Sequence, residues 1–432
     1  MTLTGLTAAY LRDRALNTAL NVLILMLAVA TMVILVLFSS QLGERFERDG
    51  RGVDLVVGAK GSPLQLILSS VYHLDVPTGN IPLAALDTLR SDPTVARAIP
   101  LALGDNFRGH RIVGTEPAYI DHYEGRLAAG RLWASEGEVV LGADAARRTG
   151  AGLGQKFLGS HGLADQAGAE HEGKPFQVVG ILAPTGAVLD RLVLTSVESV
   201  WDVHGIAHQG HDEVAEAAGH AEGDGHAHEE HQGGEGASGP ANASVQPEGG
   251  AAEITAILVS YRSTLAAVRL PAFINRQTSL QAAVPAVETT RLLSLLGIGI
   301  EAARTLGGLL MLTGALSIFV ALYTALRQRE ADMAMLRVMG AKPAAIFAQV
   351  LGEGVALAAA GAVLGVLVGH GVVAIAASQV ERLQEIGLDP WRFEMAEFWI
   401  VLAALVAGAL AALLPALRVF RVDIAQTLAH AR

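Results

Sequence analysis

Long apolar stretches near the two ends of the chain dominate its hydrophobic pattern. Residues 19–38 read ALNVLILMLAVATMVILVLF and contain no charged side chain. A helix needs about 20 such residues to cross a bilayer, so this stretch predicts a first span. A cleaved signal peptide would have a shorter apolar core of about 7–15 residues, followed by a small-residue cleavage site. The run instead continues into Ser39, which predicts a retained anchor.

The same pattern predicts three further spans in the last third of the chain. We expect a stalk and second span at 291–326, a third span at 346–377 and a fourth at 397–420. A short outer loop at 378–396 joins the last two. The long interval 39–290, between the first and second spans, follows a different pattern.

Short runs of β-branched and apolar residues, separated by turn residues, indicate strands in the region 39–290. The candidate strands are Val53–Val57, Arg111–Gly114, Glu138–Leu141, Phe176–Leu182, Leu192–Thr195 and Ile254–Ser260. Helices are predicted at Pro82–Arg90 and Ala143–Thr149. The predicted fold is therefore a membrane protein with four transmembrane α-helices and a large mixed α/β extracytoplasmic domain between the first and second helices.

Basic residues near the span ends predict the orientation, because cytoplasmic loops carry an excess of Lys and Arg. They precede the first span, lie between the second and third, and follow the fourth: Arg12, Arg14, Arg327, Arg329, Arg337, Lys342, Arg418 and Arg421. We therefore expect residues 1–18, 327–345 and 421–432 to be cytoplasmic and residues 39–290 to lie outside.

Composition and charge exclude several classes of function. The 432 residues are 51% hydrophobic and 17% charged, and the net charge is −11. Between Arg191 and Arg262 there are twelve acidic residues and no Lys or Arg, so the acidity belongs to one segment, and a nucleic-acid partner is not expected. The absence of cysteine excludes disulfides, thiolate metal sites and cysteine nucleophiles.

The segment between the second and third spans has a distinctive order of residues. It reads RQREADMAMLRVMGAKP from Arg327 to Pro343, a charged start followed by apolar positions. Gly340 suits a helix C-terminus, and Pro343 suits the first turn of the next helix. By composition alone this is either a short amphipathic helix at the membrane face or an ordinary basic loop.

This segment resembles the coupling region of the MacB/FtsX superfamily of ABC transporter permeases, whose pattern is approximately R-x-R-E-x-A-x-L-R-x-x-G-A. The residues at those places are Arg327, Arg329, Glu330, Leu336, Arg337, Gly340 and Ala341. The ending Leu414–Arg418 and Val422–Leu428 is similar to the family's P-A-x-R…D-P-x-x-x-L, although Ile424 replaces the proline. In the region 39–290, the matching features in family order are Gly130-Arg131, Glu138–Gly142, Gly154 and Phe176–Leu182.

The resemblance implies a permease subunit in the bacterial cytoplasmic (inner) membrane, working as a homodimer with two copies of an ABC ATPase. The segment 327–342 would dock into that ATPase, and motion would pass to the outer domain by mechanotransmission, where an extracytoplasmic partner could receive it. The chain itself is predicted to be non-catalytic, because none of its four lysines is followed by Ser or Thr as a P-loop requires. It also has no H-E-x-x-H or G-x-S-x-G motif, and no cofactor for catalysis is expected.

Small residues recur in the spans at helical spacing. Gly361, Gly365 and Gly369 form two consecutive G-x-x-x-G steps, which allow helix backbones to approach closely. In the fourth span Ala403, Ala407 and Ala411 repeat this spacing. We expect both faces to pack against other helices, while the remaining faces contact membrane lipids.

A histidine tract lies within residues 204–250, which combine Gly, Ala, His, Asp and Glu and are predicted to be disordered. Its histidines are His204, His208, His211, His220, His226, His228 and His231. Imidazole with neighbouring carboxylates binds Zn²⁺ or other transition metals, so weak, exchangeable metal sites and a role in zinc handling are expected. Two alternatives keep the tract incidental: export of a peptide, lipid or lipoprotein, or an FtsX-like scaffold that activates an extracytoplasmic partner.

Overall fold

A computed structural model describes residues 15–161, 175–203, 252–329, 337–380 and 388–421, with Arg12, Met333 and Met335 as single positions. The chain divides into two compact units. The helical unit comprises Met1–Glu47 and Thr290–Arg432, and the α/β unit comprises Arg48–Thr289. The predicted insert at 204–250 and the two motif positions Glu330 and Leu336 lie outside the described residues.

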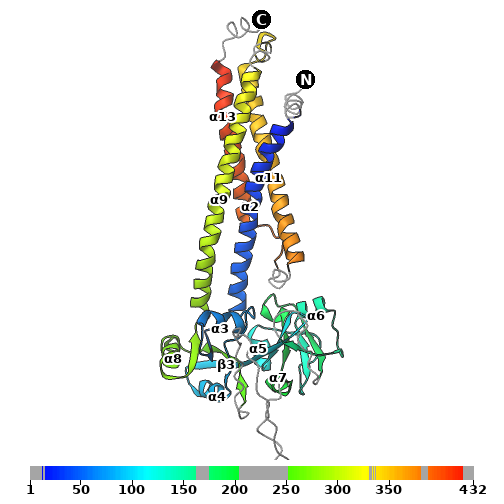
Figure 1. The fold of residues 1–432 in the computed structure, drawn as a ribbon, viewed down its shortest axis with the longest axis vertical. Helices are drawn as coiled ribbons and strands as arrows, with labels where there is room; N and C mark the ends of the chain where they lie inside the picture. Colours follow the sequence, from blue (N-terminus) through cyan, green and yellow to red (C-terminus); the bar gives the residue numbers. More distant parts are fainter. Residues whose placement is uncertain are drawn as a thin grey trace, which may run out of the picture. The chain divides into compact units, whose positions relative to one another are not determined.

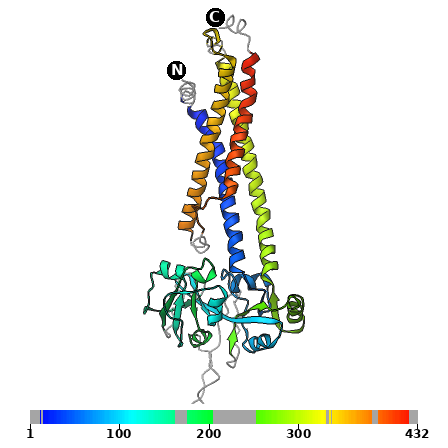
Figure 2. The ribbon, with the colours of Figure 1, turned by 180° about the vertical axis from the view of Figure 1, so that it is seen from behind.

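Four helices of the described chain are long and apolar enough to cross a membrane. They are α2 (Ala15–Asp49), α9 (Pro285–Gln328), α11 (Pro343–Gln379) and α13 (Met395–Arg418), which runs into a short 3₁₀ turn, η2 (Val419–Arg421). In Figures 1 and 2 these helices run side by side. The predicted fold class, four spans with a mixed α/β domain between the first and second, is confirmed.

Local sequence explains where two of these helices begin. Pro343 occupies the first turn of α11, where the missing N–H of proline costs nothing. At the start of α13, the backbone N–H of Glu394 donates to Oε1 of Glu397 at 3.1 Å, and the Glu394 side chain accepts from the Glu397 N–H. This capping box satisfies two amide groups that a helix start leaves open.

The glycines of α11 lie directly against α2. A Cβ added at Gly361 would be 2.9 Å from Cβ of Leu25, and one added at Gly365 would be 2.6 Å from Cβ of Val29. The same construction at Gly369 gives 2.9 Å to a methyl carbon of Val33. Three side chains of α2, spaced four residues apart, therefore occupy the places that side chains on α11 would fill.

The fourth span packs most closely through residues next to those predicted. The buried positions of α13 are Ala404, Gly408 and Ala412, whereas Ala403 is exposed. Gly408 meets Ala358, and Ala412 meets Gly354, both on α11. The most deeply buried positions thus lie one residue along from the predicted stripe, of which Ala407 and Ala411 are partly buried, because the close approach at Gly354 and Gly408 sets the rotation of the helix.

The α/β unit is built on a sheet of eleven strands in the described residues. Its main order is β13-β1-β12-β3-β4-β10-β6-β9-β5, with β7 against β9 and β8 against β3. The strands are β1 (Leu55–Ala59), β3 (Val95–Phe107), β4 (His110–Gly114), β5 (Leu127–Gly130), β6 (Glu138–Leu141), β7 (Lys156–Phe157), β8 (Ser160–His161), β9 (Phe176–Leu182), β10 (Val193–Thr195), β12 (Ala256–Tyr261) and β13 (Leu280–Ala283). A separate pair joins β2 (Ile81–Pro82) to β11 (Glu253–Ile254).

Short helices cover this sheet. They are α3 (Pro63–Ser70), α4 (Ala84–Ser91), α5 (Pro117–His122), α6 (Ala143–Thr149), α7 (Val197–Val203), α8 (Thr264–Gln277) and the 3₁₀ turn η1 (Val188–Arg191). One core contains Leu55, Ile257 and Trp201, and a second contains Phe107, Phe157 and Phe176. Strand β9 and helix α6 have the bounds expected from the sequence. Strands β3 and β13 and helices α3, α5, α7 and α8 were not predicted.

Candidate functional site: the coupling end of the helical unit

Three helix ends meet where the predicted coupling segment lies. Helix α9 ends at Gln328, α11 begins at Pro343 and α13 ends at Arg418. A separate buried cluster forms here, which we call the coupling cluster: Leu326, Met333, Ile346, Val350, Ala416 and Val419. Met333, which lies between α9 and α11 in the sequence, therefore packs on the ends of these helices.

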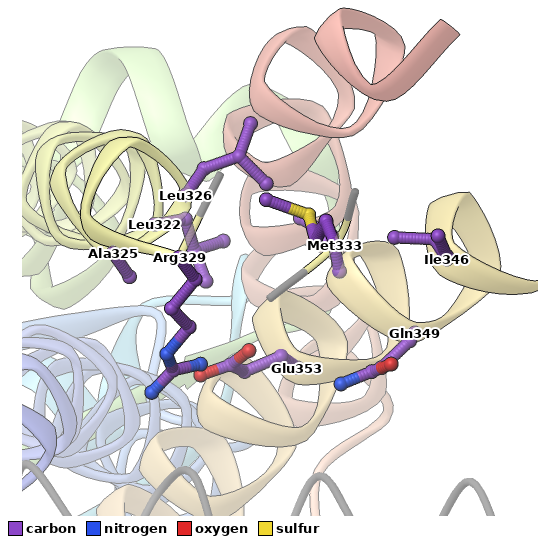
Figure 3. Close-up of a pocket in the computed structure, with 9 residues that line it drawn as sticks. Leu322, Ala325, Leu326, Arg329, Met333, Ile346, Gln349 and Glu353 are labelled. Carbon is purple, nitrogen blue, oxygen red and sulfur yellow. The ribbon is translucent and has the colours of Figure 1, made fainter. Parts of the chain in front are cut away.

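A small cavity lies within the coupling cluster (Figure 3). It is lined by Leu322, Ala325, Leu326, Arg329, Met333, Ile346, Gln349, Val350 and Glu353. Its volume of about 30 Å³ is enough for a water molecule. In Figure 3 the guanidinium of Arg329 and the carboxylate of Glu353 point toward each other. Opposite charges from the coupling segment and from α11 therefore face one another in a largely apolar setting.

An aromatic and cationic group lies beside the coupling cluster. Nη1 of Arg418 donates a hydrogen bond to the Tyr323 hydroxyl at 2.7 Å, and its guanidinium carbon is 4.5 Å from the centre of the Tyr323 ring. The guanidinium carbon of Arg327 is 5.5 Å from the same centre. A guanidinium over an aromatic ring is attracted to it. Through these contacts with Arg418, Tyr323 connects the ends of α9 and α13.

The coupling segment presents an apolar surface to its surroundings. Met335, Val338 and Met339 are 58%, 65% and 71% exposed, whereas Met333 is buried. Backbone hydrogen bonds from Met333 N to Arg329 O and from Met339 N to Met335 O, each 3.0 Å, continue the helical turns of the segment. We call Met335, Val338 and Met339 the exposed coupling face. Contiguous exposed apolar side chains are typical of protein interaction sites.

The predicted coupling residues differ in position and burial. Arg327 and Arg329 lie at the end of α9, and Ala341 packs on the coupling cluster. Arg337 is half-buried, and Gly340 is exposed with φ of +100°, the left-handed conformation that glycine accommodates at a helix end. The sequence did not identify the exposed coupling face. Its apolar residues were visible, but only the packed structure distinguishes the side that Met333 buries.

A second polar group lies at the other end of the helical unit, where α11 ends and α13 begins. Nε2 of His370 is 2.9 Å from Oε2 of Glu397, and Nδ1 is 2.5 Å from the carbonyl oxygen of Pro390. Both side chains are buried. In the sequence, His370 and Glu397 stand out as titratable residues at apolar runs, which marks them as candidates for a functional site. That they pair with each other depends on the fold.

The α/β unit contains its own buried polar cluster. Arg191 donates to the Asp49 carboxylate at 2.9 Å, and the Tyr123 hydroxyl donates to the Asp49 carbonyl at 2.7 Å. Nearby, Nε2 of His73 is 3.1 Å from the Tyr119 hydroxyl. Burial, with the positive charges of Arg111 and Arg191, holds the pKa of His73 well below its usual value. Burial also raises the pKa of Tyr119 and Tyr123.

The predicted metal ligands fall outside the described residues. These are the seven histidines between His204 and His231. In the part of the chain that the structure describes, no group of three or more His, Asp or Glu side chains is placed to hold a metal ion.

Comparison with known proteins defines the family. Residues 18–219 match the MacB-like periplasmic core domain, and residues 304–424 match the FtsX-like permease C-terminal domain. The chain therefore belongs to the MacB/FtsX-type family of ABC transporter permeases, which are membrane components that in general work with an ABC ATPase.

Two solved structures resemble part of the chain. The periplasmic region of MacB from Actinobacillus actinomycetemcomitans has a TM-score of 0.33 and 13% identity, covering 56% of this chain and 95% of its own. The extracellular domain of YknZ, a noncanonic ABC-type transporter from Gram-positive bacteria, has a TM-score of 0.29 and 10% identity, covering 53% of this chain and 98% of its own. No curated protein sequence matches this chain.

Proposed function

We propose that this chain is a membrane lever driven by a separate ABC ATPase, with motion received at the coupling end and passed to the α/β unit. The exposed coupling face carries this proposal. This face presents three large apolar side chains to water. Covering them with a partner subunit lowers the free energy of the assembly. An ATPase subunit is the partner that the family provides.

The orientation of this assembly follows from the charges at the span ends. Arg327, Arg418 and the other basic residues there favour a cytoplasmic location for the coupling end and for both termini. The α/β unit is then extracytoplasmic, in a bacterial inner membrane. We propose two copies of the permease with two copies of the ATPase.

Rigid packing supports mechanotransmission as the mechanism. The side chains of α2 occupy the glycine positions of α11, and Gly354 and Gly408 bring α11 and α13 together. Closely packed helices transmit displacement because their interior has little free volume. ATP-driven movement at one end of α11 would therefore displace its neighbours as well.

A charge on the exposed coupling face tests the proposal. Val338→Glu in the tagged full-length chain, purified with its ATPase from native membranes, should reduce both retained ATPase and ATP hydrolysis by roughly tenfold or more, because a buried carboxylate is costly. Val268→Glu is the matched control, since Val268 is 76% exposed on α8 of the α/β unit. Equal retention of the ATPase by both variants would overturn the proposed docking face.

We also propose that the histidine tract links this permease to zinc. Seven histidines between His204 and His231, among carboxylates and without Lys or Arg, favour binding of a divalent metal. Deleting residues 204–250, or replacing the seven histidines with Asn, should impair growth in chelator or alter cell zinc. A normal metal response would favour export of a peptide, lipid or lipoprotein instead. An envelope or division defect on disabling the ATPase would favour a signalling scaffold acting on an extracytoplasmic partner.

A further inference from the structure

The segment that joins α11 to α13 is fastened to α2. We call its residues 388–394 the strap. Nε2 of Gln41 donates to the Asp389 carbonyl at 2.9 Å, and the Asp389 N–H donates back to Oε1 of Gln41 at 2.7 Å. Arg392 donates to both carboxylate oxygens of Glu44 at 2.6 and 2.7 Å. The strap thus links the hairpin of α11 and α13 to α2.

His370 holds the strap from the other side through a contact that fixes where one proton lies. The Pro390 carbonyl can only accept a hydrogen bond, so the Nδ1 that lies 2.5 Å from it carries a hydrogen. Nε2 of His370 lies 2.9 Å from Oε2 of Glu397. A hydrogen bond here requires one further proton, either on an imidazolium facing a carboxylate or on a carboxylic acid facing neutral imidazole.

Because both side chains are buried, this proton decides whether His370 and Glu397 attract or repel each other. His370 and Glu397 are only 3% and 1% exposed. The His370 ring lies parallel to Trp391, with a centroid distance of 6.3 Å, and its centroid is 5.0 Å from that of Phe393. If the proton leaves, a lone pair on Nε2 faces a carboxylate where water cannot compensate, so the two side chains repel each other.

We propose that His370 and Glu397 form a proton-binding site that controls whether the strap stays fastened to α2. The charged groups of the strap and of the part of α2 that binds it are Glu44, Asp389, Arg392 and Glu394, with Arg392 paired to Glu44 and Glu394. The 2.9 Å contact between Nε2 and Oε2 is attractive only while that proton is bound. Loss of the proton as the pH rises therefore frees the strap together with the start of α13.

The absence of cysteine allows a direct test, because a pair of engineered cysteines is the only attachment point for spin labels. We would label Gly43→Cys and Leu388→Cys in the full-length chain in lipid nanodiscs and measure the distance distribution at about pH 6.5 and about pH 9. Gly43 has open space around it, so the label does not disturb packing. The expected result is one narrow distribution at the lower pH and a broader, longer one at the higher pH.

Two variants assign the change to this site. In Glu397→Gln the amide can donate to neutral Nε2 while its oxygen still accepts from Glu394, so the distribution should stay narrow at both pH values. His370→Ala removes both contacts and should give the broad distribution at both. A wild-type distribution that does not change with pH would overturn the proposal, as would a Glu397→Gln variant that opens like the wild type. Because Glu397→Gln is expected to retain the packing, the test holds even where His370→Ala fails to fold.

Discussion

His73 shows how strongly a single position in the α/β unit is constrained. Its backbone has φ of +55°, in the left-handed region that residues other than glycine rarely adopt. Its ring is buried against the Tyr119 hydroxyl, with Arg111 and Arg191 close enough to lower its pKa. The fold therefore holds this histidine in its neutral form at a strained position.

This burial predicts that acid destabilises the α/β unit. The folded pKa of His73 lies well below 6.5, whereas the unfolded chain takes up the proton near pH 6.5. The stabilisation is therefore complete above about pH 6.5, and up to about 1.4 kcal/mol is lost per pH unit as the pH falls below it. Denaturant unfolding of the full-length chain at about pH 7.5 and pH 5.5 measures this slope.

The variant His73→Asn isolates the contribution, because asparagine tolerates the left-handed conformation and does not titrate. Its free energy of unfolding should fall less between the two pH values than that of the wild type. His110 and His122 also have lowered pKa values because of burial, so they leave a residual slope in both proteins. Identical slopes in wild type and variant would contradict the prediction.

Among the elements, α11 depends most on the size of its residues. Gly365 has Cβ of Val29 at 2.6 Å and the carbonyl oxygen of Met26 at 2.9 Å from the place where a side chain would begin. Even a methyl group there would push α2 and α11 apart. Overpacking of this kind costs about 1–3 kcal/mol.

We therefore predict that Gly365→Ala lowers the thermal stability of the helical unit in detergent. Gly371→Ala is the control on the same helix, because a Cβ at Gly371 meets nothing within 4 Å. The control should be neutral or slightly stabilising, since alanine favours helix over glycine by about 1 kcal/mol. Equal melting temperatures for the two variants would show that the contact is not tight.

The elements also show what the sequence could reveal. The length of the apolar runs predicts the four long helices. The four-residue spacing of the glycines in α11 predicts the face that packs against another helix. Alanines occupy so many positions of α13 that composition alone did not determine its rotation. Strand β3 was missed because Pro100 and Gly104 interrupt its pattern, although tertiary pairing with β12 and β4 holds it extended.

The candidate site was only partly predictable for a similar reason. The order of charged and apolar residues left two interpretations of the coupling segment open, and Arg327 and Arg329 were predicted from the resemblance to the family. Which methionine is buried and which are exposed depends on the ends of α11 and α13, far away in the sequence. The partnership of His370 with Glu397 likewise depends on how two helices pack.

At the scale of the whole molecule, the coupling cluster is where the proposed ATPase would act on the helices. Arg329 and Glu353 face each other there (Figure 3), and reversing either charge places like charges in the cavity. We predict that Arg329→Glu or Glu353→Arg alone lowers the ATP hydrolysis of the purified complex severalfold. The double variant should recover much of it, because opposite charges face each other again.

A double-variant cycle measured on both ATP hydrolysis and thermal stability checks this prediction. Arg304→Glu on α9 is the control, since Arg304 pairs with Glu301 on an exposed surface, where such pairs contribute little. Losses that simply add in the double variant would show that the two charges act independently.

The four-residue spacing of Leu25, Val29 and Val33 against Gly361, Gly365 and Gly369 has one more consequence. Both sets repeat at the same interval of about 6 Å, four residues at 1.5 Å each. Sliding α2 along α11 by one interval would set only two of the three side chains against glycines, because the positions four residues beyond the repeat are Leu357 and Val373. The three matched pairs therefore specify one axial register of α2 against α11, so a force along either helix moves the two together without slip.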